Sequence, residues 1–221
     1  QPPAPVIRHE WTEVTVGTTH TYHFDDPGVN PDEWFWNLRD EYTNLVNKNE
    51  SKTESYYTIT FDTPPGLYYF EARYRDKFYG CYSPWDSLNI EVFAVPTIAF
   101  SDSTPDVINC SATMPLPDGQ FPFVVEYTGV TRYGYTYEVY NYYNNVPEYT
   151  GVIDSLTNRS DTIYIDNMFI NNTDRSQPWR VVITEAHNEE GVDVNIIRGR
   201  EKRTIWIYPK PIIYDDIDFA N

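Results

Sequence analysis

Basic residues, cysteine and methionine are all scarce in this chain. Its 221 residues include 16 lysines and arginines against 33 aspartates and glutamates, so the formal net charge is −17. Non-specific binding of nucleic acid depends on lysine and arginine side chains that neutralise phosphates, and anionic membrane surfaces attract basic segments. The charge therefore argues against nucleic acid and against an anionic membrane surface as partners.

Long hydrophobic runs are also absent. No stretch approaches the ~20 apolar residues that a membrane-spanning helix needs, so the sequence predicts no membrane insertion. Aromatic residues, in contrast, make up 17% of the chain and include 20 tyrosines, a composition that argues against disorder. At ~100–200 residues per domain, the length corresponds to one large domain or two small ones.

The two cysteines, Cys81 and Cys110, do not form a Cys-x-x-Cys pair, and no histidine lies at metal-ligand spacing from either. This pattern argues against a zinc site. Two interpretations remain open. The pair could form a single disulfide in an oxidising compartment, or both could be buried, inert thiols, because free cysteine behaves as a small hydrophobe.

The dominant pattern along the chain is alternation of period two in runs rich in Val, Ile, Thr, Tyr, Phe and Trp, which suit a pleated, half-buried surface. These runs cover residues 12–16, 19–24, 56–61, 67–74, 88–93, 121–127, 135–140, 162–165, 179–184 and 204–208. Pro- and Gly-containing turn signals separate many of them. No stretch shows helical periodicity over three turns. The sequence therefore predicts an all-β sandwich or barrel.

A domain boundary is expected at the Val95-Pro96 step, where one predicted strand ends and another begins. Proline cannot donate a hydrogen bond to a strand ladder, so it suits a short, stiff linker between β domains. We predict one domain over residues 1–95 and a second over 96–211, each near the ~100 residues of an immunoglobulin-type sandwich. Residues 212–221 form a predicted acidic tail or linker.

Several local motifs point to a known group of domains. The first half has Val14-Thr-Val-Gly17, Trp36 at a third-strand position, and Phe61-Asp-Thr-Pro-Pro-Gly-Leu-Tyr68, followed by Gly80-Cys-Tyr-Ser83. The second half has Asp118-Gly-Gln-Phe-Pro-Phe-Val-Val-Glu-Tyr127. Together these resemble the PKD-like and immunoglobulin-like domains of exported Bacteroidetes surface proteins.

The resemblance covers roughly 190 residues, and it departs from the family in two places. The second cysteine that often accompanies Cys110 in such modules is missing, and Asn37-Leu-Arg-Asp40 stands where many PKD domains have Gly-Asp-Gly. The resemblance implies two tandem antiparallel immunoglobulin-like (PKD-like) β-sandwiches. It also implies an extracytoplasmic location: the cell surface, the periplasm or the medium.

A tyrosine-rich strand is the main candidate for ligand binding. By alternation, Tyr133, Tyr135 and Tyr137 share one face, while Tyr140 and Tyr142 point the other way. One face must pack on a second sheet, and the other could present rings to a sugar or a protein. The alternative is that both rows are half-buried structural residues. We take all five as candidate ligand-binding residues.

Calcium is the candidate metal, and no other cofactor is expected. Asp215, Asp216 and Asp218 form an acidic group beyond the second domain, and hard oxygen ligands in loops of extracellular β modules suit Ca²⁺. The sequence contains no EF-hand-like loop. The alternative is that these are solvated acids in an acidic protein.

Nothing in the sequence selects catalytic residues. No carboxylate pair stands out, there is no Gly-x-Ser-x-Gly turn, and His20 and His23 point to opposite faces of their strand. The sequence predicts a non-enzymatic spacer or protein-interaction and adhesion unit with a protein or glycan partner at the cell surface. Two alternatives stay open: a carbohydrate-binding module that uses exposed tyrosines, and accessory domains of a larger secreted hydrolase.

Overall fold

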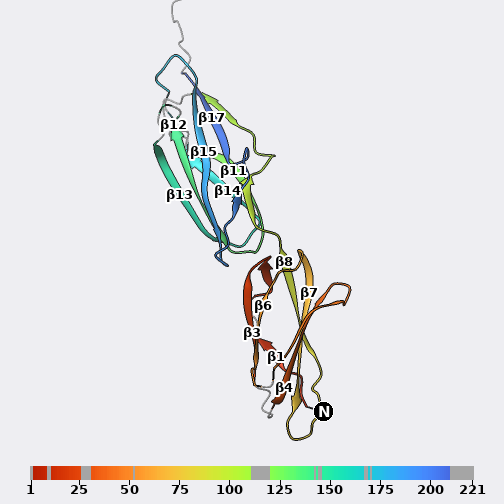
Figure 1. The fold of residues 1–221 in the computed structure, drawn as a ribbon. Coiled ribbons are helices and arrows are strands. Elements are labelled where there is room, and N and C mark those ends of the chain that lie inside the picture. The colour runs from red at the N-terminus through yellow and green to blue at the C-terminus, as the bar shows by residue number, and fades with distance from the viewer. Residues whose placement is uncertain are drawn as a thin grey trace, which may run out of the picture. The chain divides into compact units, whose positions relative to one another are not determined.

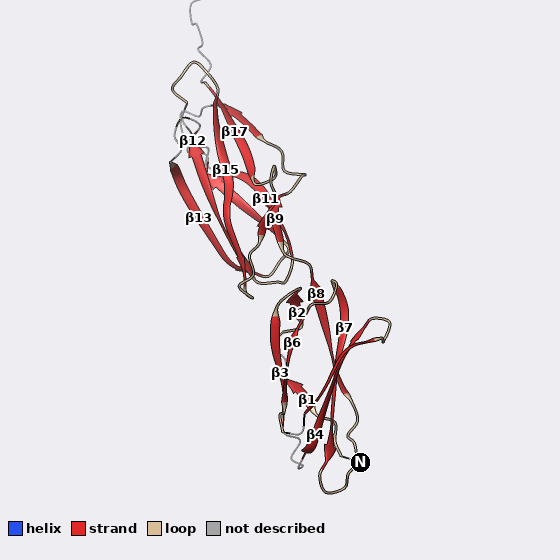
Figure 2. Ribbon diagram, in the orientation of Figure 1, coloured by secondary structure: helices blue, strands red, loops and turns tan. Residues whose placement is uncertain are grey.

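A computed structural model describes residues 2–8, 11–25, 31–51, 53–110, 120–141, 143, 146–166, 169 and 171–209, with the side chain of Cys110 excepted. Strands joined by turns and loops make up this part of the chain, and no helix occurs in it (Figure 2). The predicted all-β class is confirmed. The strand runs follow the period-two segments of the sequence because alternate side chains of a strand lie on opposite faces of its sheet.

The chain divides into two compact units (Figure 1). The first comprises Gln1–Pro96, together with Gly129–Thr131 and Asn188–Asp193. The second comprises Thr97–Thr128, Arg132–His187 and Val194–Asn221. Each unit has its own hydrophobic core.

The first unit consists of two sheets. The three-stranded sheet has the order β1 (Val6–Arg8), β3 (Thr19–Asp25), β6 (Tyr56–Thr60). The five-stranded sheet has the order β2 (Glu13–Thr15), β8 (Asp86–Phe93), β7 (Gly66–Asp76), β4 (Pro31–Asp40), β5 (Leu45–Ser51). The strand pairs are antiparallel apart from β2 and β8, which run parallel.

Aromatic side chains fill the core between these two sheets. Trp36 on β4 is fully buried, and its ring centroid lies 3.9 Å from that of Phe24 and 5.6 Å from that of Phe70. At the start of β7, the Tyr68 hydroxyl donates a 2.7 Å hydrogen bond to the Pro64 carbonyl four residues upstream. This is the tyrosine-corner arrangement of immunoglobulin-type sandwiches.

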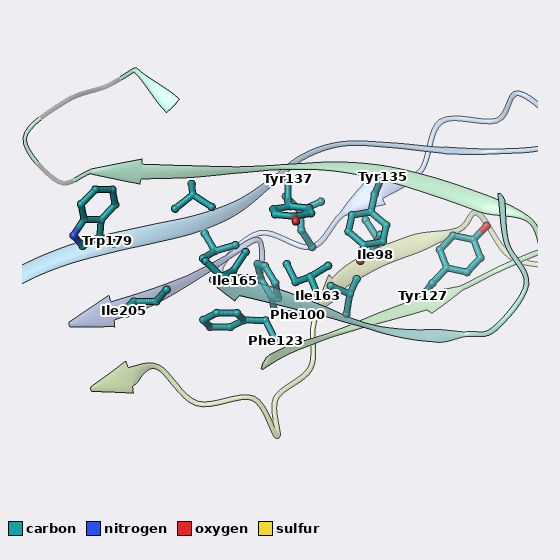
Figure 3. Packing of buried hydrophobic residues seen from close by; sticks show 14 of the residues in the cluster. Ile98, Phe100, Phe123, Tyr127, Tyr135, Tyr137, Ile163, Ile165, Trp179 and Ile205 are labelled. Atoms are coloured by element: carbon teal, nitrogen blue, oxygen red, sulfur yellow. The ribbon is translucent and has the colours of Figure 1, made fainter. Parts of the chain in front are cut away.

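The second unit has the same plan. Its four-stranded sheet has the order β14 (Ser160–Asp166), β11 (Gln120–Thr128), β9 (Thr97–Phe100), β16 (Asn195–Ile196). Its five-stranded sheet has the order β10 (Val107–Cys110), β17 (Lys202–Tyr208), β15 (Gln177–Asn188), β12 (Tyr133–Asn141), β13 (Pro147–Leu156). Inward-facing aliphatic and aromatic residues of both sheets meet in one core (Figure 3).

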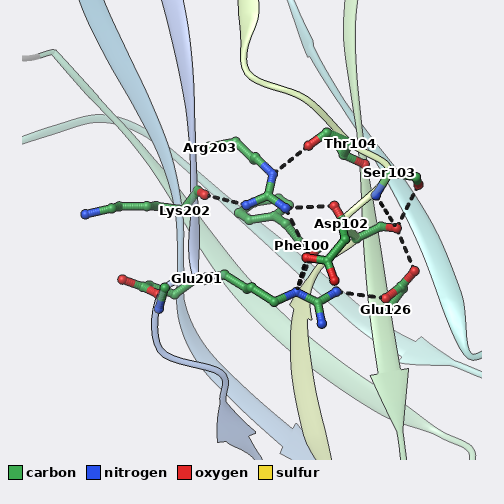
Figure 4. A network of polar contacts seen from close by, with 11 residues as sticks. Phe100, Asp102, Ser103, Thr104, Glu126, Glu201, Lys202 and Arg203 are labelled. Atoms are coloured by element: carbon green, nitrogen blue, oxygen red, sulfur yellow. Dashed lines mark hydrogen bonds and ion pairs between the residues drawn. The ribbon is translucent and has the colours of Figure 1, made fainter.

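The segment 101–106 crosses from one sheet of the second unit to the other, because β9 and β10 lie in different sheets. Arg203 on β17 holds this crossing (Figure 4). Its Nε donates to the Thr104 carbonyl at 2.8 Å and its Nη2 to the Ser101 carbonyl at 2.7 Å. A single guanidinium thereby pairs two backbone carbonyls of a segment that has no ladder of its own.

Arg200 extends the same network. Its guanidinium donates to the Phe100 carbonyl at 3.1 Å and to the Glu126 carboxylate at 3.0 Å, and that carboxylate also accepts a 2.6 Å bond from the Ser101 hydroxyl. The hydrogen bond from Ser101, and then the one from Arg200, hold the pKa of Glu126 below its ordinary value. These contacts fix the ends of β9 and β11 to the turn that precedes β17.

The two units share a strand topology that defines their class. In each, the first strand is split in two: β1 and β9 belong to one sheet, while β2 and β10 pair parallel with the last strand of the other sheet, β8 and β17. This split first strand, with an inner Trp or Tyr on the third strand, is the pattern of an immunoglobulin-like β-sandwich. The predicted pair of such sandwiches is therefore present.

Candidate interaction surface

The tyrosine strand does not form the exposed platform that three of its residues were predicted to provide. Tyr133, Tyr135 and Tyr137 on β12 are 2%, 0% and 5% exposed and belong to the core of the second unit. Figure 3 shows Tyr135 and Tyr137 among core aliphatic side chains. Their predicted ligand-binding role is corrected, because the sheet formed by β14, β11, β9 and β16 covers this face.

Burial also sets the chemistry of these three hydroxyls. Removal from water disfavours the phenolate and raises the pKa of Tyr133 to about 12, with a further contribution from the Asp161 charge. Burial likewise raises the pKa of Tyr135, whose hydroxyl donates a 2.7 Å hydrogen bond to the Asp161 carboxylate. These hydroxyls stay neutral near neutral pH and act as core polar groups.

The other face of β12 is partly open to solvent. Tyr140 is half-buried; its hydroxyl donates to the Glu138 carboxylate, and the Arg180 guanidinium carbon lies 5.8 Å from its ring centroid. Tyr142 lies outside the described residues. Of the predicted residues that the structure describes, Tyr140 alone has a partly accessible ring, and Glu138 and Arg180 contact it.

The calcium prediction falls on Asp215, Asp216 and Asp218, which lie outside the described residues. Within the described ranges, no group of three or more His, Cys, Asp or Glu side chains is arranged to hold a metal ion. Calcium binding stays a prediction. It is tested by the melting temperature of the full chain with added Ca²⁺ and then with a chelator, since a bound ion stabilises the folded state by mass action.

Cys81 forms no disulfide within the described part of the structure, and the alternative interpretation of a buried thiol is wrong for it, because its side chain is exposed. This residue carries a free, exposed thiol, whose Sγ lies 3.5 Å from the Tyr79 carbonyl oxygen. The side chain of Cys110 lies outside the described part of the structure. Cys81 follows a turn at the end of the β7 strand, where the chain projects its side chains into solvent rather than into either core.

That turn, between β7 and β8, is the most exposed aromatic feature of the first unit. Phe78 and Tyr79 are 75% and 82% exposed. They form the tip Lys77-Phe-Tyr-Gly80, and Gly80 adopts a φ of +65°, a left-handed conformation that favours glycine. Two large rings therefore stand in water at the end of a hairpin.

The tip is held by hydrogen bonds that its backbone amides donate to a buried carboxylate. Asp76, the last residue of β7, accepts the amides of Phe78 and Tyr79 on its Oδ1 at 2.8 and 2.9 Å. Its backbone carbonyl accepts the Gly80 amide at 2.9 Å, and its own amide donates to the Cys81 carbonyl at 2.9 Å. An aspartate that accepts amides two and three residues on is a standard way to fix a turn.

A second aromatic group lies beside this hairpin on the outer face of the five-stranded sheet. The guanidinium carbon of Arg73 lies 4.4 Å from the ring centroid of Tyr82, 4.5 Å from that of Trp85 and 5.5 Å from that of Phe35. Cation–π contacts of this kind hold rings in place without burying them. Tyr82 and Trp85 both remain exposed.

This loop lies outside the strands on which the sequence-predicted ligand-binding residues fall. The signal was present in Asp76-Lys-Phe-Tyr-Gly80. Aspartate and glycine mark the turn, and consecutive aromatics between them have no strand face to pack against. Large apolar residues inside a tight turn are a better indicator of an exposed surface than tyrosines that alternate along a strand.

No protein-family model and no curated protein matches the sequence. Among solved structures, the chain is similar to an apo-form Calx CBD1 domain, at 10% identity and a TM-score of 0.40, over 53% of this chain and 99% of that one. It is similar to the BSP domain of a biofilm associated protein, at 12% identity and a TM-score of 0.30, over 95% of this chain and 30% of that one.

It is also similar to a segment of two fibronectin type III domains from chicken tenascin, at 12% identity and a TM-score of 0.31, over 93% of this chain and 96% of that one. We transfer no property of these proteins to this chain. By its own strand topology it is a pair of immunoglobulin-like β-sandwich domains. The described residues include no helix long and apolar enough to cross a membrane.

Proposed function

We propose that this chain is a non-enzymatic protein-interaction module that binds a partner through the tip formed by Lys77–Gly80. The observation that carries the proposal is the exposure of Phe78 and Tyr79 on a turn fixed by Asp76. Large exposed aromatics are costly in water. Aromatic residues, tyrosine among them, are enriched at protein interfaces, where they fill pockets of the partner.

The fixed turn favours tight binding. Association normally costs about 0.5–1.5 kcal/mol for each rotamer-rich side chain that must be ordered, and more for a mobile loop. Here Asp76 makes four hydrogen bonds that hold the turn before any partner arrives: it accepts three through its carboxylate and its carbonyl and donates one through its amide. The partner that fits is a folded protein with an apolar pocket for two rings.

Charge supports a different protein as the partner rather than a second copy of this chain. At −17, two copies repel each other at long range. The rim of the tip is mixed in sign, because Arg75 pairs with Glu33 at 3.1 Å on the neighbouring strand. Rim charges of this kind set orientation and encounter rate more than affinity.

The experiment compares full-length wild type with the double variant Phe78→Ala/Tyr79→Ala as immobilised bait against proteins of the source organism. Tyr42→Ala is the matched control, because Tyr42 is also a highly exposed aromatic on a turn of the first unit. We expect a saturable partner that the double variant loses and the control retains. If every saturable partner of wild type binds the double variant equally well, the proposal is wrong.

We further propose that the module works outside the cytoplasm as part of a bacterial surface protein, on the basis of the motif resemblance. The spacer role belongs to the same proposal, since tandem sandwiches hold a binding surface away from its attachment point. Labelling of intact cells with an antibody against the chain tests the location. Labelling that requires permeabilised cells would contradict it.

A further inference from the structure

The second unit contains a cavity of about 160 Å³. It lies between β13 and β14, the edge strands of the two sheets. At ~30 Å³ per water molecule, its volume corresponds to about five waters. The cavity is thus suited to one small ring or one side chain rather than to an extended ligand.

The walls of this cavity are graded from apolar to polar. Trp179 and Phe169 form a buried aromatic floor, with ring centroids 4.5 Å apart. Tyr149 on β13 and Tyr164 on β14 line it with exposed rings. A ligand that enters between the strands therefore meets two tyrosine rings before it reaches the indole.

The residues that line the cavity include both hydrogen-bond acceptors and a hydrogen-bond donor. The exposed carboxylates of Glu148 and Asp166 line the cavity and accept hydrogen bonds; Asp166 already receives one from the Gln120 amide at 2.9 Å. The Trp179 side chain is only 8% exposed, and its buried indole Nε1 has no hydrogen-bond partner among the described residues. A buried indole N–H normally finds an acceptor, so a ligand oxygen that reached this donor would complete its hydrogen bonding.

The Tyr149 ring of the cavity is supported by the core of the second unit. The hydroxyl of Tyr149 is hydrogen-bonded to that of the buried Tyr137, and the two ring centroids are 6.0 Å apart. Tyr137 in turn packs over Gly151, where a Cβ would come within 2.3 Å of its ring. Tyr149 thus has a fixed support in the core, which is what a pre-formed binding surface requires.

We propose that this cavity binds a neutral sugar ring of a carbohydrate. A pyranose offers an apolar C–H face for the rings of Tyr149 and Tyr164, hydroxyl protons for the carboxylates, and hydroxyl oxygens for a donor such as Trp179 Nε1. Few small ligands combine all three. The site is independent of the tip formed by Lys77–Gly80 and goes beyond the protein-interaction role.

The charge of the site determines which sugars it accepts. Neither Glu148 nor Asp166 forms an ion pair with a described residue, and the described residues that line the cavity include no lysine or arginine. Uronic acids and sulfated sugars would bring a negative charge against two unpaired carboxylates, which is unfavourable. An ammonium or guanidinium group would suit the carboxylates and rings but offers no acceptor for the indole.

The test is affinity electrophoresis of the full-length chain in soluble neutral polysaccharides, namely glucans, mannans, galactans and xylans, with a polyuronate run in parallel. We expect retardation by at least one neutral polymer and none by the polyuronate. Tyr149→Ala and Tyr164→Ala should each weaken binding by about fivefold or more, as expected for loss of an aromatic contact. The double variant should show no retardation.

Two further variants test whether sugar binding is independent of the Lys77–Gly80 tip and whether the carboxylates cause the rejection of polyuronate. Phe78→Ala/Tyr79→Ala should bind sugar as wild type does, so that failure of the loop proposal and of this one can be told apart. Glu148→Gln/Asp166→Asn should reduce the rejection of polyuronate. The proposal is overturned if no neutral polymer in the panel binds, if binding survives the Tyr149/Tyr164 double variant, or if only a lysine-rich peptide occupies the cavity.

Discussion

The ring of Tyr137 lies across Gly151, its direct partner in the β12–β13 ladder. A Cβ built on Gly151 would sit 2.3 to 2.5 Å from three atoms of the Tyr137 ring and hydroxyl, closer than any real contact allows. The pair therefore works as one unit: glycine on the edge strand provides the space that a large core ring on the neighbouring strand fills.

Replacement of Gly151 by alanine should destabilise the second unit, because the Tyr137 ring must move within a packed core. Overpacking of this kind costs about 1–3 kcal/mol. Urea unfolding of the full chain measures it. Val152→Ala, at an exposed position next along β13, serves as the control and should stay within about 0.5 kcal/mol of wild type. Equal stability of the two variants would contradict the expected clash.

Replacement of Asp76 by alanine should loosen the tip that carries Phe78 and Tyr79. The amides of both residues lose their common acceptor, Oδ1, and loss of such a turn-fixing side chain costs about 1–2 kcal/mol. Amide hydrogen exchange at the two positions should accelerate. Asp76→Asn keeps an oxygen acceptor and should have the smaller effect; the reverse order would show that the turn is held by other contacts.

Replacement of Arg203 by lysine should lower the stability of the second unit although the charge is kept. The guanidinium donates to carbonyls at Ser101 and Thr104 in fixed directions, and an ammonium cannot match that geometry. We expect a loss of about 1–3 kcal/mol from the carbonyls left without a donor. Chemical denaturation provides the measurement. The neighbouring exposed Lys202 is the control, and Lys202→Ala should be near neutral.

Alkaline pH should unfold the second unit through its buried tyrosines. In the folded chain the pKa of Tyr133 is about 12 and those of Tyr135 and Tyr137 are also raised by burial, whereas unfolded tyrosines titrate near 10. The folded state therefore holds these protons more tightly, so its stability is constant below pH ~10 and falls as the pH rises from ~10 to ~12.

Tyrosinate absorbance and unfolding should be followed together in that pH window. Exposed tyrosines should titrate first in the folded chain, and the buried ones only as the structure is lost. Tyr133→Phe should shift unfolding to higher pH, because it removes one group that unfolding allows to ionise. Full titration of all tyrosines near pH 10 with the fold intact would contradict the burial argument.

Strand identity was largely predictable from local pattern, with one instructive exception. The motif resemblance placed Trp36 on a third strand, and the structure places it on β4 and buries it completely. The segment Leu45–Ser51, in contrast, forms strand β5, although none of the period-two runs covers it. Its side chains are almost all exposed and polar because it is an edge strand, so there is no buried face to produce an alternating pattern.

The sequence could not decide which face of the tyrosine strand would be buried. Tyr133, Tyr135 and Tyr137 alternate with Gly134, Thr136 and Glu138, and that pattern identifies two faces without assigning the sheet that covers one of them. Assignment requires the partner strands, which are distant in the chain. The buried row gave the wrong candidate site, while Tyr149 and Tyr164, on two edge strands, line a cavity.

The sequence by itself determined the all-β class, most strand positions and the strongly acidic surface, because alternation, turn residues and charge are local properties. The tertiary structure decided the sites. Phe78 and Tyr79 lie on a turn whose conformation is fixed by hydrogen bonds to the buried Asp76. The cavity exists because the edges of two sheets, β13 and β14, meet around Trp179. Both features depend on contacts between elements, which no local pattern specifies.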